Sequence, residues 1–179
     1  MMNVQLKWLA AINLVGGVSV LGSYAWGILS HPHNRSELWG EISGSLYLLY
    51  FPCMFIAAAS YLWFTWYLFT MVDVESVKVF GKYGFTVFNI AYVGILLFST
   101  MWIPLTLHAL DTSNSNLKIW INIVLWSTAF FSMLMLGALA TLEPTGPSTQ
   151  HKFAVLGAIL FCFQTVILDA LIWPRYFSI

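Results

Sequence analysis

The sequence predicts an all-α fold, a polytopic transmembrane bundle of five helices with short loops and no soluble domain. Three observations predict it. Of the 179 residues 60% are hydrophobic, only 8% are charged, and five apolar stretches are long enough to cross a bilayer. Soluble domains carry about 25% charged residues. The 7 Lys and Arg and 7 Asp and Glu of this chain could not cover a water-soluble surface of its size. We therefore expect residues 1–179 to form a single transmembrane domain.

The five helices are located by length. The hydrocarbon core of a bilayer is about 30 Å thick, so a helix needs about 20 apolar residues to cross it. The stretches that meet this length are residues 8–29, 45–72, 84–107, 119–141 and 153–173. The first stretch contains no charged residue. The second contains Pro52, which predicts a kink in that helix.

Polar or charged segments, two of them with proline, separate the five stretches. Residues 143–148, for example, combine two prolines with a glycine and must break a helix. Residues 37–44 predict a short interfacial helix before the second span. With five spans, one membrane side holds Lys7, Lys78, Lys82 and Lys152, and the other holds Arg35, Lys118 and Arg175. This charge bias predicts an integral plasma or inner membrane protein with its N-terminus inside and its C-terminus outside.

Charge and cysteine content exclude two classes of function. The net charge is zero and the sequence has no basic run, so nucleic acid is not an expected partner. Cys53 and Cys162 both lie inside apolar stretches and form neither a CxxC motif nor a zinc-binding spacing. We interpret them as small buried hydrophobic residues.

Three of the four histidines are expected on one membrane face, because the first loop, the third loop and the C-terminus share a side. His31, His33 and His108 lie there, together with Glu37 and Glu41. With a carboxylate they could bind zinc, copper or iron, and the alternative is that they are exposed loop histidines. A haem held between two helices needs histidines well inside opposing spans, and none of the four meets this condition. The sequence therefore assigns no cofactor.

Asp169 is the only charged residue inside any expected span. Ionisable groups in a membrane helix are rare and mark functional sites. Helical spacing places Cys162, Thr165 and Asp169 on one stripe. We predict a ligand or proton site formed by Asp169, Thr165, Gln164, His108, Glu37 and Glu41. The alternative is a structural ion pair or hydrogen bond, with Arg175 or Arg35 as the partner.

Aromatic residues make up 17% of the chain and crowd the second span. Tyr47, Tyr50, Trp63 and Trp66 could form an aromatic wall for a flat or apolar ligand such as a pigment, quinone, sterol or porphyrin. The alternative is that these rings face lipid or pack against other helices. The first span carries small residues that predict close helix packing, within the bundle or with another subunit. They are Gly16, Gly17, Gly22, Ser23 and Gly27.

These features favour a non-catalytic role. The leading hypothesis is a small membrane protein that is a subunit of a larger complex or binds a lipophilic ligand, whether a lipid, quinone, pigment or porphyrin. The expected partners are the bilayer and other membrane subunits or further copies of the chain. One alternative is a small oligomeric proton-coupled transporter that uses Asp169. The other is a membrane enzyme with a histidine and carboxylate site at one membrane face.

Overall fold

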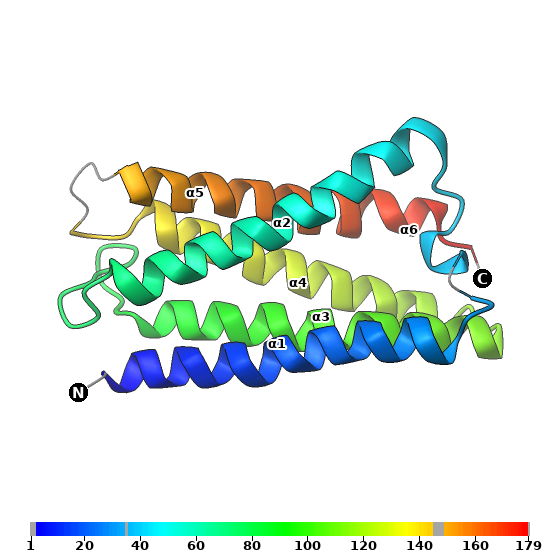
Figure 1. Cartoon of the computed structure of the whole chain (residues 1–179), viewed down its shortest axis with the longest axis horizontal. Coiled ribbons are helices and arrows are strands. Elements are labelled where there is room, and N and C mark those ends of the chain that lie inside the picture. Colours follow the sequence, from blue (N-terminus) through cyan, green and yellow to red (C-terminus); the bar gives the residue numbers. More distant parts are fainter. Residues whose placement is uncertain (1–2, 35, 145–148, 179) are drawn as a thin grey trace.

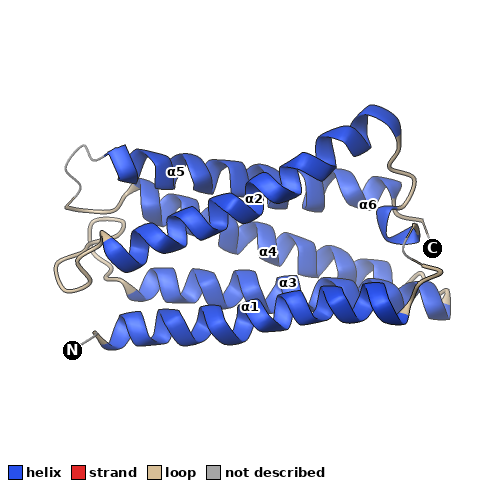
Figure 2. Ribbon diagram, viewed as in Figure 1, coloured by secondary structure: helices blue, strands red, loops and turns tan. Residues whose placement is uncertain are grey.

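The computed structural model describes residues 3–34, 36–144 and 149–178. Over these ranges the chain runs from one end of the molecule to the other five times, along its long axis (Figures 1 and 2). The described residues contain no strand, so the all-α prediction is confirmed. The first four crossings are single helices: α1 (Val4–Ser30), α2 (Gly44–Thr70), α3 (Thr86–Thr112) and α4 (Leu117–Ala140). The fifth crossing has three parts: α5 (Thr149–Cys162), a π-helical segment (Phe163–Ile172) and α6 (Trp173–Tyr176).

All five crossings are 24 to 28 residues long and apolar enough to span a bilayer. Their bounds lie within a few residues of the predicted spans. On length and composition the protein is therefore a five-span integral membrane protein. Pro52 lies inside α2, as expected, and α2 runs obliquely across the other helices (Figure 1). The interfacial helix predicted at residues 37–44 is a single 3-10 turn, Glu37–Trp39.

The helices pack in the order α1, α3, α4, α5, α2. In this series each helix packs against the next, while α1 and α2 have few close contacts, one of them a hydrogen bond from the Tyr61 hydroxyl to the Asn13 Oδ1 at 2.6 Å. One end of the bundle, here called the histidine end, holds the α1–α2 and α3–α4 loops and the C-terminus (right in Figure 1). The opposite, lysine end holds the N-terminus and the α2–α3 and α4–α5 connections. This arrangement places the odd loops and the C-terminus together, as the count of five spans predicted.

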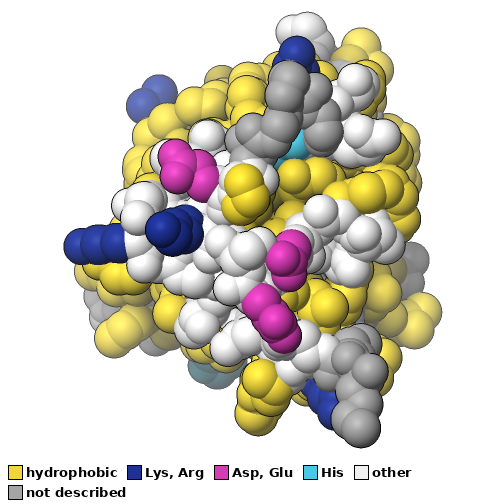
Figure 3. Space-filling view, turned by 90° about the vertical axis from the view of Figure 1, so that its left-hand side faces the viewer, with side chains coloured by type: hydrophobic (Ala, Val, Ile, Leu, Met, Phe, Trp, Pro, Cys, Tyr) yellow, Lys and Arg dark blue, Asp and Glu magenta, His cyan; other side chains and the backbone are white. Residues whose placement is uncertain are grey.

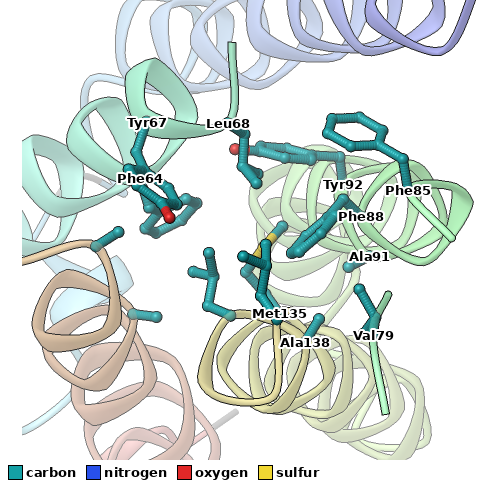
Figure 4. Close-up of a cluster of buried hydrophobic side chains, with 14 of the residues drawn as sticks. Phe64, Tyr67, Leu68, Val79, Phe85, Phe88, Ala91, Tyr92, Met135 and Ala138 are labelled. Atoms are coloured by element: carbon teal, nitrogen blue, oxygen red, sulfur yellow. The ribbon is translucent and has the colours of Figure 1, made fainter. Parts of the chain in front are cut away.

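Aromatic side chains fill the centre of the bundle near the lysine end. Figure 4 shows Phe64 and Leu68 of α2 meeting Tyr92 of α3 and Met135 of α4, and all four are buried. Lipid tails are as apolar as these side chains, so association of the helices depends on close packing and hydrogen bonds more than on the hydrophobic effect. One such hydrogen bond joins the Thr65 and Tyr92 hydroxyls at 2.6 Å.

Glycines let α1 approach α3 closely at two positions. A Cβ added to Gly16 would lie 2.7 Å from the Cδ1 of Leu96, and one added to Gly27 would lie 2.4 Å from the Cγ2 of Ile103. These two glycines therefore pack inside the bundle. Gly17 and Gly22 differ, because nothing lies within 4 Å of a Cβ added to either. The remaining small residue, Ser23, donates a hydrogen bond within its own helix, to the Val20 carbonyl at 2.8 Å.

Backbone pairing joins the two connections at the lysine end. The Lys78 amide donates to the Glu143 carbonyl at 2.7 Å, and the Glu143 amide donates back to the Lys78 carbonyl at 2.8 Å. Nearby, the Asp73 carboxylate accepts hydrogen bonds from the Ser76 hydroxyl and the Glu75 amide, which hold the pKa of Asp73 below its ordinary value. Figure 3 looks onto this end and shows cationic and anionic side chains scattered among hydrophobic ones.

Candidate functional site

The π-helical segment brings Gln164 and Asp169 together. In an α-helix, residues five apart point about 140° away from each other, because each residue advances the helix by about 100°. The wider π turn, with i→i+5 hydrogen bonds, instead returns to the same face after five residues. Here the Trp173 amide donates to the Leu168 carbonyl. The Gln164 Nε2 donates to the Asp169 Oδ1 at 2.8 Å.

This geometry corrects the predicted stripe of Cys162, Thr165 and Asp169. The stripe assumed α-helical spacing, which does not hold between Phe163 and Ile172. Thr165 is buried, but its hydroxyl donates to the Phe161 carbonyl one turn back, at 3.1 Å. Asp169 therefore has Gln164 as its bonded neighbour. Single-turn π insertions occur frequently at functional sites, so the change of helix type is itself a reason to examine this position.

The amide oxygen of Gln164 is buried and has no hydrogen-bond partner. The residue is only 6% exposed, and its Oε1 makes no hydrogen bond in the described part of the chain. An unpaired buried acceptor costs about 1–3 kcal/mol, so native structures seldom leave one. The orientation of the amide follows from its neighbour, since a carboxylate accepts and the NH₂ group must face it.

Tyr50 of α2 links that helix to the π segment. Its side chain is buried, and its hydroxyl donates to the Leu168 carbonyl. The same carbonyl also accepts the Trp173 amide. The phenol of Tyr50 lies close enough to Asp169 to interact electrostatically with the carboxylate. Of the four residues of the predicted aromatic wall, Tyr50 is thus the one that reaches Asp169.

Two more aromatic residues, from α1 and α3, complete the surroundings of Asp169. Tyr24 of α1 lies within electrostatic range of the carboxylate. Its ring lies 5.9 Å from that of Trp102 of α3, which in turn lies 5.6 Å from the ring of Trp173. The indole nitrogen of Trp102 is buried and has no hydrogen-bond partner among the described residues. We call Tyr24, Tyr50, Trp102, Gln164 and Asp169 the Asp169 centre.

Trp173 anchors the C-terminal side of this centre. Its indole nitrogen donates to the Leu38 carbonyl in the first loop at 2.9 Å, and its ring stacks on Phe177 at 4.3 Å. The loop and the end of the fifth crossing are therefore tied together just beyond Asp169. Asp169 itself is only partly buried, and α1 and α2, which carry Tyr24 and Tyr50, do not pack along each other. The carboxylate is thus not sealed inside the bundle.

The histidines predicted as a metal site are not brought together. His31 pairs through its Nε2 with the Asp111 carboxylate at 3.1 Å, which also accepts a hydrogen bond from Asn34 at 2.8 Å. His33 and His108 are exposed. In residues 3–34, 36–144 and 149–178, no group of three or more His, Cys, Asp or Glu side chains is arranged to hold a metal ion. The described residues therefore do not provide an arrangement of side chains that could bind a metal ion.

The acidic and basic residues expected near Asp169 have other positions. Glu37 is exposed and begins the 3-10 turn. The carboxylate of Glu41 accepts a hydrogen bond from the Ser178 hydroxyl at 3.5 Å. Within the described ranges, the one ion pair closer than 4 Å is His31 with Asp111, so Arg175 does not pair with Asp169. Arg35, the other predicted partner, lies outside the described residues.

The rest of the predicted aromatic wall is divided between two regions. Tyr47 packs edge-on against Trp39 near the histidine end, with 5.0 Å between ring centroids. Trp63 and Trp66 lie further along α2, each 41% exposed, with their rings 5.1 Å apart. Trp63 and Phe153 flank a shallow apolar groove of about 420 Å³ between α2 and α5. The four predicted rings therefore do not form one surface.

Sequence reasoning missed Tyr24 and Trp102 as site residues. Nothing in the spacing along the chain relates them to Asp169, because each comes from a different helix. The available signal was that both are aromatic residues with a polar atom, which usually find a hydrogen-bond partner when buried. Comparison with known proteins adds no further residue: no family model, curated protein or solved structure matches this chain. The functional argument therefore depends on the geometry of the Asp169 centre.

Proposed function

We propose that this protein is a membrane-embedded binding protein for a lipophilic small molecule, and that the polar group of the ligand is held at the Asp169 centre. The observation that carries the proposal is the buried, unpartnered amide oxygen of Gln164. A ligand group that donates a hydrogen bond to this atom removes the free-energy penalty of leaving it unpaired.

The surroundings of Gln164 support a ligand with a small polar end and an apolar body. Tyr24 of α1 and Tyr50 of α2 lie within electrostatic range of the Asp169 carboxylate. Trp102 of α3, which packs against Tyr24, has an unpartnered indole N–H. Ligand sites in proteins usually combine apolar and aromatic walls with a few polar groups that orient the ligand. Asp169 is partly exposed, so a ligand group can reach it without unfolding of the bundle.

The two alternative functions have less structural support. A metal-dependent enzyme needs a set of donors that the described residues do not contain. A proton-coupled transporter needs a pathway to Asp169, and in the described part of the chain the carboxylate is hydrogen-bonded to the Gln164 amide. A bound metal ion in the experiment below would favour the enzyme, and pH-dependent flux in proteoliposomes that is lost on Asp169→Asn would favour the transporter.

The test is native mass spectrometry of the protein extracted gently from its own membrane. We expect a small-molecule adduct on the wild-type chain that is absent from Gln164→Leu. Asn89→Leu is a matched control, because Asn89 is also a buried amide with an unpartnered oxygen. Asn89 lies in the first turn of α3 at the lysine end, where its Nδ2 donates to the Gln5 Oε1 at 2.7 Å.

A second variant guards against misfolding of Gln164→Leu. Trp102→Phe keeps one aromatic ring but removes the indole N–H together with the second ring, and we expect it to weaken the adduct while the protein remains monodisperse. An adduct retained by both variants, or a wild-type protein that carries only bulk phospholipid, contradicts the proposal.

A subunit role is the second candidate, and α1 is the feature that favours it. Only Leu9 and Gly27 of this helix are buried, and α1 packs mainly against α3. The open space beside Gly17 and Gly22 leaves room for another helix to approach. In the same mass spectra, a larger species that contains other chains would support this role. Its loss on Gly22→Leu would assign the contact to this side of α1.

A further inference from the structure

We infer that the ligand held at the Asp169 centre carries a protonated amine as its polar end. This inference rests on the proposed function and specifies its ligand class. Three independent features of the Asp169 centre support it: the balance of acceptors and donors, the absence of a cation near the carboxylate, and the aromatic rings around it.

Unused acceptors outnumber unused donors in the Asp169 centre. The Asp169 carboxylate receives one hydrogen bond, from Gln164, and an ionised carboxylate can accept about four. The Oε1 of Gln164 is also free to accept. The Tyr50 hydroxyl already donates to the Leu168 carbonyl. The Trp102 indole N–H is therefore the one buried donor without a partner here. A ligand group that fits this inventory must mainly donate hydrogen bonds, as an ammonium does.

None of the cationic side chains that the structure describes is paired with the Asp169 carboxylate. Within the described ranges, neither Arg175 nor any Lys or His lies within 4 Å of it. Charged residues in membrane helices usually pair with one another or with a ligand that acts as counter-ion. A carboxylate without a protein counter-ion favours a cationic ligand over a neutral one. It also disfavours a ligand that carries a carboxylate or phosphate, which would place two like charges side by side.

The aromatic rings suit the same ligand. Tyr24 and Tyr50 both lie within electrostatic range of the carboxylate, and Trp102 contacts Tyr24. A cation near the face of a Trp or Tyr ring is attracted by the electron density of the ring, and the attraction strengthens where water is excluded. A carboxylate with two Tyr side chains in electrostatic range, one of them packed against Trp102, therefore suits an alkylammonium head, while the apolar body of the ligand remains in contact with helices and lipid.

The inference is tested with three probes that share one apolar body. Octadecylamine, octadecanol and octadecanoic acid, each tritium-labelled, are equilibrated with the full chain in nanodiscs of phosphatidylcholine. Empty nanodiscs of the same lipid measure partition into the bilayer, which is subtracted. We expect saturable binding of the amine to the wild-type protein. Binding of the alcohol and the acid should be at least 10-fold weaker.

Variants then assign the binding to the Asp169 centre. Asp169→Asn keeps the shape and the hydrogen bond with Gln164 but removes the charge, and should weaken amine binding at least 10-fold while leaving alcohol binding within about 2-fold. Tyr24→Leu removes one ring without touching the carboxylate and should weaken amine binding about 3-fold. Asn89→Leu should bind all three probes as the wild type does.

The outcomes separate this inference from the proposed function. Equal binding of amine and alcohol, or amine binding unaffected by Asp169→Asn, overturns the cationic ligand class. The proposed function still stands in either case if the adduct seen by native mass spectrometry depends on Gln164. Absence of protein-dependent binding for all three probes also overturns the inference. The proposed function fails separately, when no adduct depends on Gln164.

Discussion

Packing of α3 against α4 depends on the absence of a side chain at Gly94. A Cβ added there would lie 2.1 Å from the Cγ, 2.2 Å from the Cδ2 and 2.4 Å from the Cδ1 of Phe131. Carbon atoms in contact prefer about 3.5–4.0 Å, so the substitution Gly94→Ala forces these groups apart by more than about 1 Å. The clash is with the Cγ side of the Phe131 ring, close to the backbone, so a change of the side-chain tip cannot relieve it.

Phe131 has little freedom to move away. Its ring stacks on Phe98 at 6.0 Å with an interplanar angle of 18°, and it meets Phe130 edge-on at 5.2 Å. Introducing a methyl group into a well-packed interior typically destabilises a protein by about 1–3 kcal/mol. For a chain of this size each 1 kcal/mol lowers the Tm by about 2–4 °C. We therefore expect Gly94→Ala to lower the Tm by about 3–10 °C.

Thermal unfolding in mild detergent, followed by tryptophan fluorescence, measures this shift. Gly22→Ala is the matched control, because nothing lies within 4 Å of a Cβ added to Gly22 on α1. Its Tm should stay within about 1 °C of the wild-type value. The double variant Gly94→Ala with Phe131→Leu should recover part of the loss, since residues in contact give non-additive effects. A Tm for Gly94→Ala equal to that of the control would refute the packing described for α3 and α4.

Three further predictions follow from single contacts. Tyr50→Phe removes the hydrogen bond to the π segment and should reduce the free energy of unfolding, measured by denaturant titration, by about 0.5–1.5 kcal/mol. Tyr47→Phe changes an exposed residue and should leave the free energy of unfolding unchanged. Ser76→Ala should raise the pKa of Asp73 towards its ordinary value, measured by carboxyl NMR titration, and an unchanged pKa would disprove the role of the hydroxyl. Because the folded-state pKa of Asp73 is lowered, its contribution to stability is present above the ordinary pKa and disappears as the pH falls through the lowered pKa. Gly27→Ala should separate α1 from α3 at the histidine end, because its Cβ would lie 2.4 Å from the Cγ2 of Ile103. Limited proteolysis should then cut the first loop faster than in Gly22→Ala.

The membrane-spanning architecture could be predicted because its determinants add up along the chain. Hydropathy and length define each span, so the predicted 119–141 and the observed Leu117–Ala140 agree closely. The number of spans then determines which loops share a side. The shared side is visible in the structure, where His31 of the first loop pairs with Asp111 near the third loop.

The partners of Asp169 could not be predicted in the same way. Assigning a helical stripe requires a constant angle per residue, and the π-helical segment breaks that condition between Phe163 and Ile172. The neighbour of Asp169 is therefore Gln164, five residues away, in place of Thr165. The rings of the aromatic wall predicted from α2 lie in different surroundings for a related reason. Membership of one helix does not place Tyr50 and Trp63 on one surface.

The sequence by itself determined that this protein is a five-helix membrane bundle, that one end collects three histidines, and that Asp169 is the one charged residue well inside the apolar stretches. These conclusions depend on the composition of continuous segments, which lipid and water sort without regard to the rest of the fold. The tertiary structure alone decided that Gln164 bonds to Asp169, that Tyr50 reaches the π segment, and that Tyr24 and Trp102 pack together beside Trp173. The contacts between helices depend on the rotational phase and packing of four separate helices, and no local pattern in the chain encodes their relative positions.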